Sequence, residues 1–227
     1  MIREITSRLR RNPRYLWRWV FDRVYDRYFE WKLGISTSQR YTLEQLGIDL
    51  PGGYQYQPIS YGDFRQFMKL VPIRPQQDVF LDFGSGMGRA LCLAATHPFR
   101  KVIGVEISPD LNAIAEKNIS RLRHKLQCQD IQIVTSDATT YAVHADVTIA
   151  YFFTPFSSDI LAKVLDNIAR SLRENPRQLL ILYCGSSIYP GLQSQLVNCP
   201  WLTIRSETIL PTGRVGTVYE NKMWTGG

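Results

Sequence analysis

The stretch Asp82-Phe83-Gly84-Ser85-Gly86-Met87-Gly88-Arg89 decides the fold that we expect for this chain. It ends a short apolar run, Val79 to Phe83, and leads into a segment with a helical pattern, Arg89 to His97. Glycines at alternate positions let the backbone turn sharply and approach a ligand closely. The free N–H groups at the start of the following helix can bind an anion. We therefore predict a ligand-binding turn between a first strand and a first helix.

Strand-like and helix-like segments alternate after this turn. Strands are expected at 79–83, 101–106, 131–134, 147–152 and 179–183, and helices at 89–97, 109–126 and 158–172. Two more strands, 201–209 and 215–219, flank a candidate hairpin turn at Pro211-Thr212-Gly213. Short apolar runs separated by helices are typical of buried parallel strands. The pattern predicts an α/β fold with a doubly wound, mostly parallel sheet that ends in an antiparallel hairpin. Ligand sites of such sheets lie beyond the carboxyl ends of the strands.

The spacing of the glycines distinguishes between candidate ligands. The dinucleotide fingerprint G-x-G-x-x-G would need a glycine at position 89, where Arg89 stands. Asp82, two residues before the first glycine, would repel a pyrophosphate but suits a ligand with an ammonium group. No G-K-[ST] follows, which excludes a nucleotide-triphosphate loop.

Two further acids follow predicted strands. Glu106 closes the second strand, and its carboxylate can accept hydrogen bonds from both hydroxyls of a ribose. Asp137 follows the third strand and can accept from an adenine amino group. Ordinary structural roles stay open: a helix cap for Asp82, a solvated loop for Glu106 and a turn for Asp137. Taken as a site, the three acids imply an amino-acid end, a ribose and an adenine, which describes S-adenosyl-L-methionine (SAM).

The same segments resemble a known family. Residues 79–91, 102–107, 136–138 and 147–156 resemble the motif series of class I, Rossmann-like SAM-dependent methyltransferases. More narrowly, the chain is similar to bacterial members of that family whose substrates are unassigned. The resemblance implies a seven-stranded sheet over 78–220, SAM as cofactor and no metal. Residues 78–227 would form the SAM-binding methyltransferase domain, and residues 1–77 would form a basic, aromatic, helical N-terminal extension that caps the substrate side.

The resemblance also assigns roles to single residues. The implied cofactor site comprises Asp82, Gly84, Ser85, Gly86, Gly88, Glu106, Ile107, Asp137, Ala138 and Phe152. The glycine loop would bind the methionine end, with Asp82 at the ammonium and Glu106 at the ribose. Ile107 would pack on the adenine, and Asp137 with the Ala138 backbone would contact its amino group. Phe152 would border the transferred methyl, although aromatic residues of a strand also suit a plain core.

No catalytic base can be assigned from the sequence. In some N-methyltransferases an acidic or amide residue precedes Pro-Pro-aromatic at the end of the fourth strand. Thr154 stands at that position here, and its hydroxyl is a weaker acceptor than an acid or amide oxygen. Thr154 and Tyr61 are the two candidate catalytic residues. Together with Tyr54 and Tyr56, Tyr61 is also a candidate for lining an acceptor pocket or for packing.

The positive charge of the chain lies in its N-terminal segment. Residues 1–40 contain ten lysines and arginines and four acids, which accounts for +6 of the formal net charge of +7. A helix is expected over 14–33. Its apolar side chains at three- and four-residue spacing are Trp17, Val20, Phe21, Val24, Tyr28 and Trp31. This face would pack on the main domain, form a lid over a substrate pocket, or contact anionic lipid or nucleic acid. The acids at the other positions of the helix argue against contact with anionic lipid or nucleic acid.

Composition excludes several other classes of protein. The 227 residues are 44% hydrophobic and 21% charged, as expected for one globular domain with an extension. The longest apolar stretch, Val147 to Phe153, is far shorter than the ~20 residues of a membrane-spanning helix. We expect no secretory signal, because no apolar core follows the charged N-terminus. We expect no disulfides and no metal site, because the four cysteines form no C-x-x-C pair and only three histidines are present. A cytoplasmic protein is therefore expected.

The predicted function is transfer of a methyl group from SAM to an O or N nucleophile of a small molecule. The alternatives are a protein (lysine) methyltransferase, an RNA methyltransferase and a non-catalytic SAM-fold binding module. A small-molecule acceptor, with a protein acceptor as the alternative, is the expected partner. Nucleic acid is not expected, and membrane contact would be peripheral, through the N-terminal helix. A closed pocket between the N-terminal segment and residues 153–156 would favour a small acceptor, and an open groove would favour protein or RNA.

Overall fold

The computed structural model describes residues 13–42, 44–48, 56–153, 156–185 and 190–222. The helices are α2 (Pro13–Leu33), α3 (Tyr61–Met68), α4 (Arg89–Ala94), α5 (Pro109–Leu122), α6 (Ser158–Glu174) and α7 (Pro190–Val197), with short 3-10 helices η1 (Glu44–Leu46) and η2 (Arg123–Lys125). The strands are β1 (Val79–Phe83), β2 (Lys101–Glu106), β3 (Ile131–Thr135), β4 (Ile149–Phe152), β5 (Leu180–Gly185), β6 (Leu202–Ile209) and β7 (Val215–Asn221).

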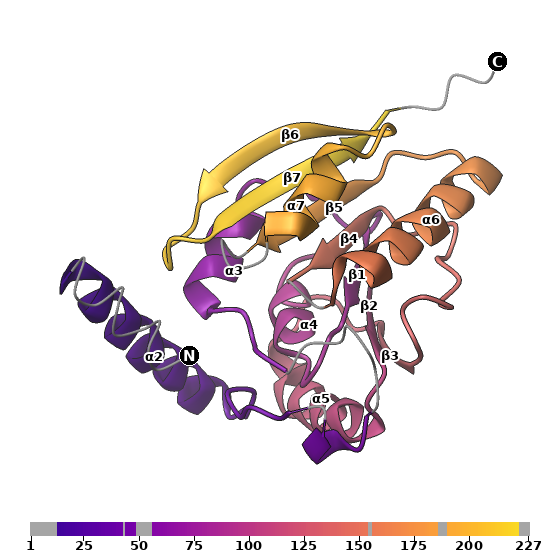
Figure 1. Ribbon diagram of the computed structural model, residues 1–227. Coiled ribbons are helices and arrows are strands. Elements are labelled where there is room, and N and C mark those ends of the chain that lie inside the picture. The colour runs from indigo at the N-terminus through magenta and orange to yellow at the C-terminus, as the bar shows by residue number, and fades with distance from the viewer. Residues whose placement is uncertain (1–12, 43, 49–55, 154–155, 186–189, 223–227) are drawn as a thin grey trace.

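The strands form one seven-stranded sheet in the order β3-β2-β1-β4-β5-β7-β6 (Figure 1). Strands β1 to β5 pair in parallel, and β7 lies antiparallel between β5 and β6. The predicted doubly wound α/β fold with a C-terminal antiparallel hairpin is therefore confirmed. The chain leaves β1 toward β2 on one side and later returns to β4 on the other side. Sheets of this kind bind ligands at such a switch point, beyond the carboxyl ends of the strands.

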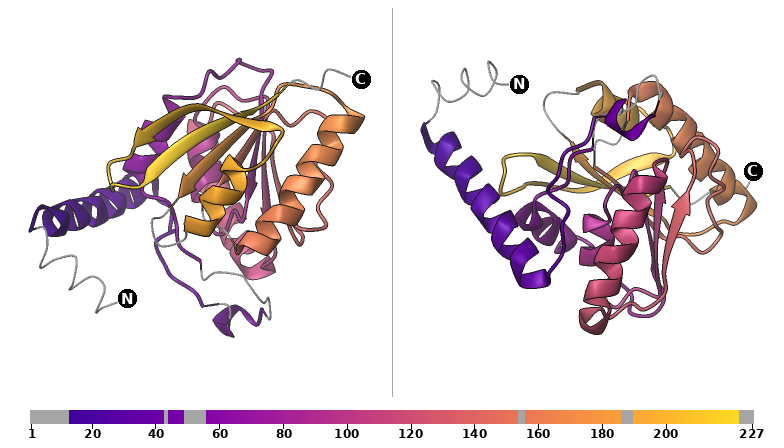
Figure 2. Two further views of the ribbon diagram at one scale, coloured as in Figure 1. Left: turned by 45° about the horizontal axis from the view of Figure 1, so that its top comes forward. Right: turned by 90° about the horizontal axis from the view of Figure 1, so that it is seen from below.

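Helices cover both faces of the sheet (Figure 2). Side chains alternate along each strand, so Phe80 and Tyr151 share a core with α3, α4 and α5. Leu81 and Phe152 lie in the second core, on the side of α6. Every residue of β1 is buried, because both of its faces are covered. This two-sided burial explains why the central strands have continuous apolar runs in the sequence.

Several predicted elements have bounds that differ by a few residues, and one helix was not predicted. Helix α4 ends at Ala94, earlier than the predicted end at His97. Pro98 follows closely, and a proline disfavours helical conformation in the residue before it. Helix α7 was not predicted, although Pro190 at its first position is a typical helix start.

The N-terminal segment packs on the sheet-containing body. Phe64 and Phe67 of α3 are buried in the same core as Phe80 and Tyr151. Helix α2 lies beside α3 and near the turn of the β6–β7 hairpin in all three views (Figures 1 and 2). The boundary between residues 77 and 78 stays a prediction. Within the described ranges, no helix combines the length and the apolar character needed to cross a membrane.

Candidate functional site

The glycine loop joins β1 to α4 and has an unusual backbone. Gly84, Gly86 and Gly88 all adopt positive φ angles, of 76°, 53° and 78°. This left-handed region disfavours residues with a side chain. At Gly88 an added Cβ atom would lie 2.8 Å from the Cβ of Ala115, so the glycine also lets α4 begin close against α5. The predicted turn is therefore present, and its conformation requires glycine.

Glu106, the last residue of β2, is hydrogen-bonded to the glycine loop. Its Oε2 accepts from the Gly86 N–H at 2.9 Å, and its Oε1 accepts from the Ser108 N–H at 3.0 Å. Burial raises the pKa of this carboxyl, while the backbone N–H donors act in the opposite direction. The carboxylate thus links the loop to the start of α5, which is not the arrangement of a fully solvated loop acid.

The buried Asp82 carboxylate lies close to Glu106. It is 3% exposed, and within the part of the chain that the structure describes no hydrogen bond or ion pair reaches its carboxylate. Burial, and secondly the charge of Glu106, raise the pKa of Asp82 well above its usual value. The Ser85 hydroxyl nearby is also buried without a hydrogen-bond partner. A buried charge is unfavourable unless it is paired. This edge of the sheet therefore suits a ligand that brings a positive charge to Asp82.

The remaining predicted cofactor residues on β2 and β3 lie at the same edge. Ile107 directly follows β2 and is half-buried. Asp137 and Ala138 follow β3, which pairs in parallel with β2. The Oδ1 atom of Asp137 accepts from the Thr139 N–H at 2.7 Å, so this carboxylate also stabilises a turn. The topology therefore brings the three acids to neighbouring strand ends.

The aromatic residues at the end of β4 have two different environments. Phe152 is fully buried, and its ring stacks on Phe83 with centroids 5.1 Å apart. Its contact with a transferred methyl group stays a prediction. Phe153 is half-buried, and the Arg214 guanidinium lies 5.2 Å from its ring centroid. Thr154 lies outside the described residues.

Two of the three candidate tyrosines are described, and both contact the loop region. The Tyr56 ring covers Gly86, because a Cβ atom added to that glycine would lie only 2.1 Å from Tyr56 Cε2. The Tyr56 hydroxyl donates to the Thr37 carbonyl at 2.9 Å. Tyr61 is buried and stacks on Phe29 with centroids 5.4 Å apart, and burial raises the pKa of its phenol. These contacts favour the packing role for Tyr61. Tyr54 lies outside the described residues.

Arg89 is a key residue that the sequence analysis missed. It follows the glycine loop directly and is 2% exposed. Its guanidinium forms ion pairs with Asp26 at 2.7 Å and Glu30 at 3.1 Å, both on α2. It also donates to Thr37 Oγ1, Ser38 Oγ and the Ile59 carbonyl, and it lies 4.5 Å from the Tyr61 ring centroid. One buried cation therefore attaches three parts of the N-terminal segment to the start of α4.

A signal for this ion-pair network is visible in the sequence. Asp26 and Glu30 are four residues apart, and like charges at that spacing destabilise a helix unless a cation lies between them. Arg89 opens α4, where a positive charge is unfavourable with respect to the helix dipole. Both features indicate partners elsewhere in the fold.

The predicted packing face of α2 is wrong for the residues whose side chains are described. Val24, Tyr28 and Trp31 are 63%, 49% and 80% exposed, so they do not pack on the body. The inward face instead carries Asp26 and Glu30 together with apolar side chains. Tyr25, Phe29 and Leu33 pack against the core. The ion pairs with Arg89 decide which side of the helix faces the body.

Comparisons with known proteins agree with this architecture. Residues 80–175 match the family model described as a methyltransferase domain. The matched range begins in β1, includes the glycine loop and Glu106, and ends after α6. In the comparison with curated proteins, no sequence matches this chain.

Solved structures with the same fold include methyltransferases. An RNA methyltransferase from Salinibacter ruber, solved with S-adenosyl-L-homocysteine, is 19% identical with a TM-score of 0.52, over 75% of this chain and 95% of that chain. A SAM-dependent methyltransferase from Aquifex aeolicus is 14% identical with a TM-score of 0.54, over 70% and 90% of the two chains. The ribosomal protein L11 methylase of Lactobacillus delbrueckii subsp. bulgaricus is 17% identical with a TM-score of 0.50, over 70% and 77%.

At these identities the structural likeness establishes the fold, and the family model adds the class of domain. Residues 80–175 carry a methyltransferase domain, and the chain shares its Rossmann-like fold with SAM-dependent methyltransferases of known structure.

Proposed function

We propose that this methyltransferase transfers the methyl group of SAM to an oxygen or nitrogen atom of a small molecule. The observation that carries the proposal is the cover over the glycine loop. The Tyr56 ring packs on Gly86, and Arg89 holds α2 and residues 37–38 against the start of α4. A covered loop admits a small acceptor more readily than a folded protein or an RNA. In this proposal residues 1–77 cap the substrate side of a domain formed by residues 78–227.

The residues at the sheet edge fit SAM. An ammonium group would supply the positive charge that the buried Asp82 carboxylate lacks. We assign the methionine end to the loop formed by Gly84, Ser85, Gly86 and Gly88. Glu106 is assigned to the ribose hydroxyls, and Asp137, with Ile107 and Ala138, to the adenine. The arrangement of these groups on neighbouring strand ends supports the assignment.

SAM supplies a methyl group that its sulfonium already activates. The task of the chain is therefore to hold cofactor and acceptor in line and to exclude water. Positioning of this kind contributes on the order of 7–11 kcal/mol to a reaction. A general base is needed only where the acceptor arrives protonated. The candidate bases Thr154 and Tyr61 stay predictions, and the buried position of Tyr61 argues for packing.

Replacement of Glu106 is expected to weaken SAM binding. In Glu106→Ala the affinity should fall by about 1.5–3 kcal/mol, the scale for hydrogen bonds to a charged group. The variant also loses the acceptor for the Gly86 N–H. Isothermal titration calorimetry with SAM measures the effect. Asp110→Ala removes an exposed acid from the first turn of α5 and is the matched control, with affinity expected near that of the unchanged chain. An unchanged affinity in Glu106→Ala would mean that Glu106 has only a structural role.

The raised pKa of Asp82 predicts a pH dependence. An aspartate has a pKa of about 3.9 in an unfolded chain. Because the folded-state pKa is higher, the free energy of unfolding of the free protein should fall as pH rises through that folded value. Binding of an ammonium group favours the ionised carboxylate, so stabilisation by SAM should grow over the same pH window. Thermal unfolding with and without SAM, followed from about pH 4 upward, measures both trends.

Asp82→Asn provides the control for this pH dependence. The variant should be more stable than the unchanged chain at pH 7 without SAM, because the cost of burying an ionisable carboxyl group is removed. It should bind SAM more weakly, and the pH dependence should be smaller. If Asp82→Asn keeps both the original affinity and the original pH dependence, Asp82 does not contact the ammonium group.

The acceptor class is tested by following the methyl group. The protein is incubated with methyl-tritiated SAM and a lysate separated into small molecules, RNA and protein. The RNA and protein fractions are included because two of the similar structures are an RNA methyltransferase and a ribosomal protein L11 methylase. We expect label in the small-molecule fraction, with Glu106→Ala giving less label from the same lysate. Label that is confined to protein or to RNA would replace the small-molecule proposal by the corresponding alternative. SAM binding without label in any fraction would favour a non-catalytic binding module.

A further inference from the structure

The outward side of α2 carries a stripe of exposed apolar side chains. Val20, Val24, Tyr28 and Trp31 are 38%, 63%, 49% and 80% exposed. Their spacing of four, four and three residues places them on one side of a helix. The other exposed large apolar residues of the described chain are Val197, Ile204 and Ile209, on α7 and β6. An exposed apolar stripe of this kind on a helix marks a site of contact with another protein or with a membrane.

The ion pairs of Arg89 fix the orientation of this stripe. Asp26 and Glu30 lie on the inward side of α2 and are only 19% and 13% exposed at their side chains. A rotation of α2 that buried Val24 and Trp31 would separate both carboxylates from the buried Arg89 guanidinium. The apolar stripe is therefore held outward by the same contacts that hold the helix on the body.

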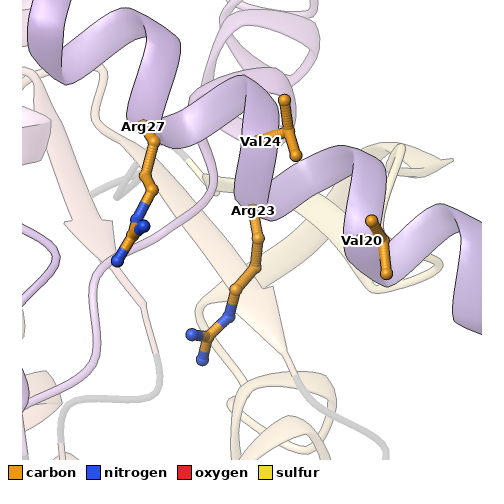
Figure 3. Close-up of a pocket in the computed structure, with 4 residues that line it drawn as sticks. All are labelled: Val20, Arg23, Val24 and Arg27. Atoms are coloured by element: carbon orange, nitrogen blue, oxygen red, sulfur yellow. The ribbon is translucent and has the colours of Figure 1, made fainter.

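The described charged side chains beside the stripe are positive. Among the described side chains from Val20 to Leu33, the exposed charged residues are Arg23, Arg27 and Lys32, and both acids face Arg89. Arg23 and Arg27 extend in parallel from the helix and line, with Val20 and Val24, an open hollow of about 280 Å³ (Figure 3). Asp26 and Glu30, two of the three acids that argued against contact with an anionic surface, are thus turned away from it, and the side chain of the third, Asp22, lies outside the described residues.

We propose that this face of α2, defined by Val20, Val24, Tyr28 and Trp31 with Arg23, Arg27 and Lys32, docks on a membrane surface that contains anionic lipid. Aromatic and valine side chains would enter the boundary between headgroups and acyl chains. Arginine and lysine side chains can extend from that depth to the lipid phosphates. A second copy of the chain on this face would place its own arginines against these, which the like charges disfavour. The membrane site is separate from the methyl-transfer site and does not depend on the identity of the acceptor.

Co-sedimentation with vesicles tests the proposal. Vesicles of phosphatidylcholine with about one third phosphatidylglycerol are compared with pure phosphatidylcholine at low and high salt. We expect the full chain to bind the anionic vesicles, with weaker binding at high salt and on neutral vesicles. In the double variant Val24→Glu/Trp31→Glu, binding should be on the order of tenfold weaker or more. The double variant Val197→Glu/Ile204→Glu makes the same change in charge at two exposed apolar positions elsewhere and should bind like the unchanged chain.

Folding and association are followed in parallel. Both double variants should keep the affinity for SAM and the thermal midpoint of the unchanged chain, since all four positions are exposed. The proposal is overturned if the unchanged chain does not bind anionic vesicles, or if both double variants lose binding equally. It is also overturned if light scattering shows a dimer that only Val24→Glu/Trp31→Glu dissociates, because the stripe would then be an interface between two copies.

Discussion

Gly86→Arg abolishes SAM binding while the chain still folds: this is the largest effect on ligand affinity that we expect. Gly86 has a φ angle of 53°, and a Cβ atom there would overlap the Tyr56 ring at 2.1 Å. The arginine side chain would displace the Tyr56 ring and extend over the glycine loop, to which we assign the methionine end of SAM. The side chain that must move is Tyr56, which belongs to neither hydrophobic core, so the chain should still fold. A loss of more than about a thousandfold in affinity, roughly 4 kcal/mol, is expected.

Calorimetry with SAM and circular dichroism check this result together. Gly47→Arg is the matched control, because Gly47 has a φ angle of 63° and open space around it. That substitution introduces the same side chain and similar backbone strain away from the glycine loop, and SAM affinity should not change. Normal SAM affinity in a folded Gly86→Arg variant would place the cofactor somewhere else.

Arg89→Met is expected to have the largest effect on stability. The substitution leaves the Asp26 and Glu30 carboxylates without the buried cation that they share. Loss of one partner of a buried ion pair lowers the free energy of unfolding by about 3–5 kcal/mol. We also expect α2 to separate from the body, so that trypsin cleaves the N-terminal segment faster. Urea denaturation and limited proteolysis measure the two effects.

Two further variants show whether the effect comes from the buried ion pairs. Arg100→Met breaks an ion pair with Asp146 whose side chains are 41% and 40% exposed, and should cost less than about 1 kcal/mol. The triple variant Arg89→Met/Asp26→Leu/Glu30→Leu removes the two carboxylates that lose their cation and should recover part of the stability, since it also removes the acceptors of the Tyr61 and Thr37 N–H groups. Equal losses in Arg89→Met and Arg100→Met would show that Arg89 does not attach the N-terminal segment.

The strands and the glycine loop were predictable because their signals are local. A strand that is buried on both faces must be apolar throughout, so β1 and β4 are visible as short apolar runs. The loop needs three positive φ angles, and its three glycines are direct evidence for that backbone. The hairpin turn at Pro211-Thr212-Gly213 is equally local. The order of the strands then follows from the rules for parallel sheets.

Part of the candidate site could not be read from the sequence. Glu106 was expected at a ribose, but its hydrogen bonds to the Gly86 and Ser108 N–H groups depend on how β2 and the loop pack. The Tyr56 ring over Gly86 comes from a segment thirty residues away in the sequence. Helix α7 was missed because its apolar pattern is weak and its role is set by packing on β5 and β6.

The sequence by itself determined the α/β alternation, the glycine turn and the acids at successive strand ends, because each of these depends on neighbouring residues. Tertiary structure alone decided which side of α2 faces the body. Both sides of that helix carry apolar and charged residues, so periodicity could not distinguish them. The choice is made by Arg89, which is 63 residues from Asp26 in the sequence and binds it in the fold. A buried cation requires its carboxylates, and that requirement leaves the apolar stripe of α2 exposed.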